Sequence, residues 1–391
     1  MKNNILYSSI LFALYSCSVN ASVMTNSGVE QSSIIVSSND TNTATNPINI
    51  KGANTIAIGN SVHIDIDQNT DARGASDGSI AIGSNAKTKY EGTTAIGKFS
   101  IANGWRATAI GADAKATDES ATAMGNDSIS SGWGSTAYGT KSRAKEGGST
   151  AIGNWAQSTA AYGTALGTSA NAKGVYSTAL GTLSKAHGYG AISIGMQSAE
   201  TAGARQNGAI SIGWNAESWG KDSSAVGANS KANGNYSSAT GTNSIASGQG
   251  SIALGANSKA NADSSLALGE SSVASAKNGV TIGHNSQVSA DSGIAIGAES
   301  VADRDALDDT MLGAVSVGGN GKTRQIINVA AGTQDTDAVN VAQLTDLQSV
   351  MESADDALSQ RITDNKTQID NNKKNISENS NAIKNNNQRF D

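Results

Sequence analysis

The sequence is poor in the residues that most folds use to hold a core together. Its 391 residues include 3 phenylalanines, 1 proline and 1 cysteine. A single cysteine cannot build a disulfide framework, and so little phenylalanine excludes an ordinary aromatic core. No apolar run reaches the length of a membrane-spanning helix, so we expect no membrane segment in this chain. The formal net charge of −6 is mild for this length and favours neither nucleic acid nor an anionic membrane as a partner.

The amino terminus has the pattern of a secretory signal. Residues 1–21 combine a positive charge, an apolar stretch too short to span a bilayer and a small-residue cleavage site that ends at Ala21. We therefore expect residues 1–21 to be removed and the exported chain to begin near Ser22, with a linker over residues 22–51. A lipoprotein site at Cys17 is the alternative to plain cleavage.

Glycine, in contrast, is abundant and recurs with a fixed period. Seventeen glycines each end a short motif, usually a small or β-branched residue followed by an aliphatic one. Eight consecutive steps of 14 residues are followed by one step of 18 and six more of 14. The glycines are Gly59, Gly83, Gly97, Gly111, Gly125, Gly139, Gly153, Gly167, Gly181, Gly195, Gly213, Gly227, Gly241, Gly255, Gly269, Gly283 and Gly297. This repetition predicts a solenoid of stacked coils, because each copy can bury its apolar edge only against its neighbours.

Each repeat, or rung, contains two short stretches with alternating side chains. In Thr94-Ala95-Ile96-Gly97 larger residues flank a tiny one, which indicates a short strand with unequal faces. The stretch 228–234 repeats the alternation more weakly. Two strands and two turns in 14 residues predict a slim coil filled by alanine and serine, although the pattern does not settle which face points inward. At about 25 cal/mol per Å² of apolar surface, the remaining aliphatic stripe favours a homo-oligomer.

From Val341 onward the period changes to heptads. Isoleucine recurs every seven residues with asparagine three positions later. The isoleucine series is Ile362, Ile369, Ile376 and Ile383, ending in Phe390, and the asparagine series is Asn365, Asn372, Asn379 and Asn386. This pattern predicts a coiled coil, best a trimer, whose asparagine amides meet at the axis around an anion or a water molecule. The 11-residue step from Met351 to Ile362 predicts local unwinding, and a disordered asparagine-rich tail is the alternative.

Between the repeats and the heptads lies a connecting segment over residues 306–343. The stretch 332–337 contains a turn with acidic and threonine candidates for a helix N-cap, and we expect the helix to begin at Ala338. The expected domains are therefore a repeat region over 52–305, a neck over 306–343 and a stalk over 344–391.

The rungs and the neck together resemble the YadA-type trimeric autotransporter adhesins. The resemblance covers about residues 52 to 391, and its most specific part is the pair of strings at 324–332 and 335–344. It implies a mainly β chain with a C-terminal α part: a trimeric left-handed parallel β-roll head, a neck and a parallel trimeric coiled coil. It further implies a homotrimer on a Gram-negative cell surface that binds host extracellular-matrix or serum proteins, such as collagen, laminin or fibronectin, and promotes autoaggregation. Some relatives bind immunoglobulin through their stalks, and no cofactor is implied.

The chain differs from members of this family at its carboxyl end. Members of the family end in a membrane anchor of β-strands, and no such segment precedes Asp391. We therefore expect either a truncated sequence or a product that is secreted or periplasmic.

Aromatic residues are the main candidates for a ligand surface. Eight of them fall five to eight residues before a rung glycine, on the turn side of the coil, where stacking would place them in one broken column. They are Tyr90, Trp105, Trp133, Tyr162, Tyr176, Tyr189, Trp219 and Tyr236. The alternative is that they cover turns or seams between subunits. The 18-residue step adds a bulge over 200–208. We interpret this bulge as a tolerated insertion, and a binding loop is the alternative.

Two other classes of function are weaker. The sequence shows no catalytic combination, and His63, His187 and His284 share no metal-ligand spacing, so we expect no enzyme and no metal. A left-handed β-helix acyltransferase would need rungs of about 18 residues and a catalytic histidine. An ice-binding array is suggested by a column of threonines, whose aliphatic neighbours suit a buried interface better. The column consists of Thr94, Thr108, Thr122, Thr136, Thr150, Thr164 and Thr178.

Overall fold

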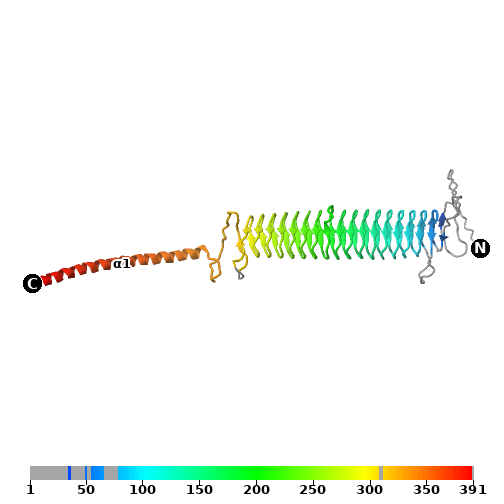
Figure 1. Cartoon of the computed structure of the whole chain (residues 1–391). Coiled ribbons are helices and arrows are strands. Elements are labelled where there is room, and N and C mark those ends of the chain that lie inside the picture. Colours follow the sequence, from blue (N-terminus) through cyan, green and yellow to red (C-terminus); the bar gives the residue numbers. More distant parts are fainter. Residues whose placement is uncertain (1–33, 37–48, 51–53, 66–77, 308–310, 390–391) are drawn as a thin grey trace, which may run out of the picture. The chain divides into compact units, whose positions relative to one another are not determined.

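The computed structural model describes residues 34–36, 49–50, 54–65, 78–307 and 311–389. The expected signal segment, Cys17 and Phe390 lie outside these ranges. The chain divides into two compact units between Thr323 and Arg324. The first unit holds short strands stacked one after another, and the second holds a single helix, α1 (Figure 1).

The odd-numbered strands form one ladder. They are β1(Ile34–Val36), β3(Ile56–Ile58), β5(Ile80–Ile82), β7(Thr94–Ile96), β9(Thr108–Ile110), β11(Thr122–Met124), β13(Thr136–Tyr138), β15(Thr150–Ile152), β17(Thr164–Leu166), β19(Thr178–Leu180), β21(Ile192–Ile194), β23(Ile210–Ile212), β25(Ser224–Val226), β27(Ser238–Thr240), β29(Ile252–Leu254), β31(Leu266–Leu268), β33(Val280–Ile282), β35(Ile294–Ile296) and β37(Val315–Ser316).

The even-numbered strands form a second ladder. They are β2(Asn49–Ile50), β4(His63–Ile64), β6(Lys87–Thr88), β8(Ile101–Ala102), β10(Lys115–Ala116), β12(Ile129–Ser130), β14(Arg143–Ala144), β16(Gln157–Ser158), β18(Asn171–Ala172), β20(Lys185–Ala186), β22(Gly203–Ala204), β24(Glu217–Ser218), β26(Lys231–Ala232), β28(Ile245–Ala246), β30(Lys259–Ala260), β32(Val273–Ala274), β34(Gln287–Val288) and β36(Val301–Ala302).

Neighbouring strands of each ladder are parallel, and equivalent residues of successive rungs lie side by side. Thr94 pairs with Thr108 and Ala95 with Ala109, so the register equals the 14-residue repeat. Strands in a sheet lie about 4.8 Å apart, so each rung advances the solenoid by that distance. The prediction of a parallel β-roll followed by a helix is confirmed.

The core is as narrow as the composition requires. The central residue of nearly every odd-numbered strand is a fully buried alanine, serine or threonine, flanked by larger, partly exposed residues. The structure therefore answers what the sequence left open: the small-residue face points into the roll. Most buried serines are satisfied locally, as where the Ser128 Oγ donates to the Gly125 carbonyl oxygen at 2.9 Å, whereas the hydroxyls of Ser149, Ser177 and Ser237 have no partner within the described part of the chain. This matters because a buried polar group without a partner is costly.

The rung glycines are required by how closely the rungs stack. Gly153 adopts a φ of +132°, which side chains with a Cβ rarely adopt. A Cβ at this position would also lie 2.5 Å from the carbonyl oxygen of Gly167 in the next rung. The fixed glycine period therefore reflects backbone-to-backbone contact between rungs.

The two outer faces of the solenoid differ in chemistry. The odd-numbered ladder presents a nearly continuous apolar face, on which Leu166, Leu254 and Ile296 remain more than a third exposed in the isolated chain. The threonine column lies on this same face. Each rung contributes one threonine, which pairs with the threonine of the next rung. The even-numbered ladder is mostly polar outside, with lysine, arginine, asparagine and glutamine among its outward residues.

The ladders extend beyond the repeat region expected from the glycines. β1 and β2 lie within the expected linker over 22–51 and pair with β3 and β4. β37 lies within the expected neck and pairs with β35. These outer strands lack the glycine period, so the sequence pattern did not reveal them.

In the second unit, α1 spans Val341–Gln388. The prediction that it begins at Ala338 was wrong, as was the placement of its N-cap over 332–337. Asn340 is the N-cap, because its side chain accepts a hydrogen bond from the Gln343 amide while the Gln343 side chain accepts from the Asn340 amide. Asp337 instead accepts from the amides of Thr333 and Gln334, which hold its pKa below the ordinary value.

Candidate functional site

The eight aromatic residues singled out in the sequence lie in the turns that follow even-numbered strands, which we call the second turns. Three of them form a contact series. The Tyr162 and Tyr176 rings are stacked with centroids 5.2 Å apart and planes within 6°. Tyr189 meets Tyr176 edge to face at 5.6 Å. We call Tyr162, Tyr176 and Tyr189 the tyrosine ladder, and each of its side chains is more than half exposed.

Three other second-turn aromatics are engaged with neighbouring side chains or loops. The Arg106 guanidinium lies 3.9 Å from the centre of the Trp105 ring, and the Trp105 Nε1 donates to Glu91 at 3.5 Å. The Trp219 Nε1 donates to the Thr201 carbonyl oxygen at 3.0 Å. The Lys89 Nζ lies over the Tyr90 ring at 5.2 Å. These contacts tie the three rings to neighbouring side chains and loops of the solenoid.

Trp133 and Tyr236 are the remaining second-turn aromatics. Their side chains are 56% and 55% exposed, among the most exposed aromatic rings of the solenoid. Exposed tryptophan and tyrosine are common anchors at binding surfaces. The structure therefore brings only the tyrosine ladder together and leaves Trp133 and Tyr236 as separate exposed rings.

Several of these tyrosines occupy a backbone conformation that suits glycine. Tyr162, Tyr176 and Tyr236 have φ values of +56°, +58° and +59°. Glycine occupies the equivalent position of other rungs, as at Gly134 and Gly190. A bulky residue in the left-handed region costs about 1–2 kcal/mol. Other rungs carry arginine, serine, aspartate or asparagine at this position with similar φ values, so the strain belongs to the turn and not to tyrosine alone.

Sequence reasoning missed four aromatic residues on the solenoid. Phe99, Trp155 and Trp214 lie in the first turns, which follow odd-numbered strands, and Tyr138 lies at the end of β13. Trp155 and Phe99 each stand two residues after a rung glycine, at φ values of +59° and +57°. Aligning all rungs on their glycines would have found them, because most rungs place a small or polar residue there.

The extra residues of the 18-residue rung lie in a first turn, between β21 and β22, earlier than the bulge expected over 200–208. Gln197 folds into the roll and its amide donates to the Ser193 and Ser211 hydroxyls at 3.1 and 3.4 Å. The carbonyl oxygen of Glu200 accepts from the side chains of both Lys185 and Arg205. The inserted turn is therefore anchored, and it positions two cations on the even-numbered ladder.

The three histidines are not brought together. His63 lies 3.5 Å from Asp65 in an ion-pair geometry. His187 is half-buried, and burial, then the charges of Lys173, Arg205 and Lys185, hold its pKa below the ordinary value. Within the described ranges, no group of three or more histidine, cysteine, aspartate or glutamate side chains could hold a metal ion.

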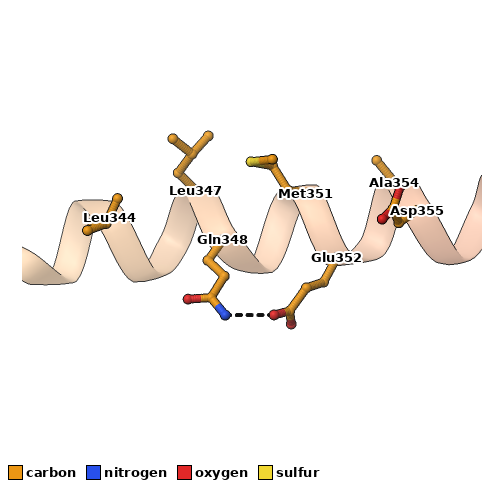
Figure 2. Close-up of a pocket in the computed structure, with 7 residues that line it drawn as sticks. All are labelled: Leu344, Leu347, Gln348, Met351, Glu352, Ala354 and Asp355. Atoms are coloured by element: carbon orange, nitrogen blue, oxygen red, sulfur yellow. Dashed lines mark hydrogen bonds between the residues drawn. The ribbon is translucent and has the colours of Figure 1, made fainter.

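The stalk residues lie on α1 as the heptads predicted. None of the helix's described residues is buried, and the four heptad isoleucines are each more than half exposed. Figure 2 shows the start of this apolar face, where Leu344, Leu347 and Met351 line a shallow pocket beside Gln348 and Glu352. A 48-residue helix with a continuous exposed apolar stripe is typical of a coiled-coil strand. In the described part of the chain, no helix is long and apolar enough to cross a membrane.

Two family models match the chain. The model described as "YadA head domain repeat (2 copies)" matches residues 76–100, 102–128, 144–170, 172–198, 220–244, 246–272, 260–280 and 274–300. The model described as "Coiled stalk of trimeric autotransporter adhesin" matches residues 325–388. Together the two matches cover more than half of the chain, and both describe structural parts of adhesins.

Two individual proteins are also similar. A stretch of 42 residues is 69% identical to part of the autotransporter adhesin BadA of Bartonella henselae. This stretch makes up 10% of this chain and 1% of BadA. The chain thus matches a very small part of that relative's length. The crystal structure of the collagen-binding domain of the Yersinia adhesin YadA aligns with 28% identity over 63% of this chain and 85% of that one, at a TM-score of 0.20. On the two family matches, the chain belongs to the YadA-type trimeric autotransporter adhesins, which are non-enzymatic surface proteins.

Proposed function

We propose that the chain is the head and stalk of a surface adhesin that binds host extracellular-matrix proteins, such as collagen, laminin or fibronectin, or host cells, and promotes autoaggregation. The observation that carries the proposal is the set of exposed second-turn tyrosines held at positive φ, where glycine would fit without strain. Rigid aromatic rings on a stiff scaffold supply contact area at a low cost in conformational entropy. Family membership supplies the context of a surface protein.

The proposal includes a homotrimer built on the apolar face of the odd-numbered ladder. That face repeats aliphatic residues such as Ile252 and Leu254 along the solenoid, and both are 44% exposed in the isolated chain. Burying such a stripe is favourable at about 25 cal/mol per Å². Packing three copies through this face leaves the second turns and the even-numbered ladder open to ligands.

In the same arrangement, three copies of α1 would form the stalk. The isoleucine series would fill the core, and Asn365, Asn372, Asn379 and Asn386 would meet around an anion or a water molecule. The amino-terminal signal would deliver the chain across the inner membrane, and the cell surface is the proposed destination.

The test is solid-phase binding of the purified chain to collagen, laminin, fibronectin and immunoglobulin, with two matched variants. Tyr176→Gly removes a second-turn ring from a left-handed position, and Trp155→Gly removes a first-turn ring from the same kind of position. Because glycine suits both backbones, neither change should unfold a rung. We expect binding to at least one matrix protein that Tyr176→Gly weakens and Trp155→Gly leaves unchanged. Binding to immunoglobulin alone, or equal loss in both variants, would contradict the proposal.

A further inference from the structure

One stretch of the even-numbered ladder is strongly basic on its outer face. In most even-numbered strands a buried small residue is flanked by one outward residue on each side. From β14 to β22, over five successive rungs, nine flanking positions face outward, since Gly203 is buried, and six of the nine carry basic side chains. We call them the basic stripe, and they are Arg143, Lys145, Lys173, Lys185, His187 and Arg205.

No carboxylate stands among the outward positions of these five strands, which the structure describes in full. The first one beyond them is Glu217 on β24, which is already paired with Lys231 at 3.2 Å and accepts a hydrogen bond from Thr201. Among the described residues, neither Lys145 nor Lys173 forms an ion pair. The turns beside the stripe contribute Glu146, which directly follows Lys145, and Glu200, which acts electrostatically on Lys185. The stripe therefore carries an excess of positive charge, not a fully unpaired one, on a chain whose formal net charge is −6.

The register arranges these cations in a line. Lys145 and Lys173 occupy the same position two rungs apart, and Arg205 follows two rungs later. At about 4.8 Å per rung, successive charges are about 10 Å apart along the solenoid. The inserted turn fixes one end, because the carbonyl oxygen of Glu200 accepts from both Lys185 and Arg205. Burial and then Lys173, Arg205 and Lys185 lower the pKa of His187, so at neutral pH the lysines and arginines carry the charge of the stripe.

The tyrosine ladder lies on the same rungs, immediately after the stripe. Tyr176 follows Lys173 by three residues, and Tyr189 follows His187 by two. A row of cations beside a row of exposed rings presents charge and flat amphipathic surface together. A chain of sugar rings with negative groups at regular intervals would complement this surface. The negative groups would lie on the cations, and the sugar rings would lie on the tyrosine rings.

We propose that this face, the basic stripe with the tyrosine ladder beside it, binds a linear sulfated polysaccharide along the solenoid axis. Sulfate groups bind the lysines and arginines, and the sugar rings contact the tyrosine side chains. The affinity of such binding decreases as the salt concentration rises. The protein's cations release counterions from the polyanion into solution, and this release becomes less favourable at high salt. The inference concerns a ligand class distinct from the matrix proteins of the proposed function.

The test measures binding of the full chain to heparin, with hyaluronan as an unsulfated polysaccharide and double-stranded DNA as a different polyanion. Lys145→Ala/Lys173→Ala removes two stripe charges. Lys115→Ala/Lys259→Ala removes two exposed lysines from the same ladder outside the stripe, so net charge changes equally. We expect heparin to bind more tightly than hyaluronan and DNA. The stripe variant should bind heparin on the order of tenfold more weakly, with a salt slope lower by about one per lysine, and the control variant should bind normally.

Three outcomes would overturn the proposal: no binding of heparin, equal losses in the two variants, or DNA bound as tightly as heparin. A chain that binds heparin but none of the matrix proteins would support this inference and contradict the proposed function. The two proposals can therefore fail separately.

Discussion

The Tyr162 ring lies flat against the Tyr176 ring in the next rung, with centroids 5.2 Å apart. Each stacked aromatic pair contributes about 0.5–1.5 kcal/mol beyond area burial. We expect Tyr176→Ala to lower the thermal unfolding midpoint, because it removes contacts with both Tyr162 and Tyr189.

The matched control is Tyr236→Ala. Tyr236 has the same turn position, a φ of +59° against +58° for Tyr176, and nearly equal exposure. Because the backbone strain is the same in both variants, the difference in midpoint measures the rings' contacts. Equal midpoints in the two variants would show that the ladder contributes nothing to stability.

Gly104 supports a second prediction about how the rungs stack. Its φ is not in the left-handed region, but a Cβ there would overlap the carbonyl group of Asp118 in the next rung. Gly104→Ala should therefore force two rungs apart and destabilise the head by several kcal/mol, as overpacking and lost strand pairing add together. Urea unfolding followed by circular dichroism measures the effect.

Gly147→Ala provides the comparison, because a Cβ at Gly147 meets only the Trp133 carbonyl oxygen at 3.8 Å, an ordinary contact. It should change stability by a few tenths of a kcal/mol. If both variants unfold at the same urea concentration, the close stacking of rungs is not what requires glycine at 104.

His187 gives the head a pH dependence. Burial and the neighbouring charges hold the pKa of His187 below 6.5 in the folded chain. Between the folded pKa and 6.5, the imidazole therefore binds a proton more readily in the unfolded chain. Stability should therefore decrease as the pH falls below the ordinary pKa of 6.5 and level off once the pH is below the folded pKa. His187→Gln should reduce the loss of stability between about pH 8 and about pH 5, measured by urea midpoints. An unchanged loss in that variant would remove His187 as the cause.

The stalk asparagines should lower the stability of the coiled coil. An asparagine at a core position specifies register at a cost in stability. Asn372→Ile, between Ile369 and Ile376, should therefore raise the helix melting temperature. Asn371→Ile places the same side chain one residue away from the apolar stripe and should have little effect. A melting temperature raised equally by both, or by neither, would place Asn372 outside the core.

Much of the head could be predicted because its period is long and regular. The 14-residue spacing of Tyr162 and Tyr176 predicts that they are neighbours, and the rings are stacked. Tyr189 comes 13 residues after Tyr176, one short of the period, and the contact becomes edge to face. The period could not show which face of Ala95 and Ile96 points inward, since both orientations give the same alternation.

The prediction was less successful where local hydrogen bonding decides the outcome. The helix begins at Val341, not Ala338, because the reciprocal bonds of Asn340 and Gln343 form the cap. Trp155 was overlooked because the predicted surface took only aromatic residues five to eight positions before a rung glycine, and Trp155 follows Gly153 by two residues. The basic stripe was hidden for another reason: Lys145, Lys173 and Arg205 are 28 and 32 residues apart in sequence, and only the register of the even-numbered ladder aligns them.

The proposed homotrimer is tested most directly by the mass of the purified chain, measured by light scattering over a range of concentrations. The exposed apolar face of the odd-numbered ladder and the exposed isoleucine stripe of α1 both require partners, so we predict the mass of a trimer. A monomer that stays folded at every concentration would contradict the account, because both apolar surfaces would then remain in water.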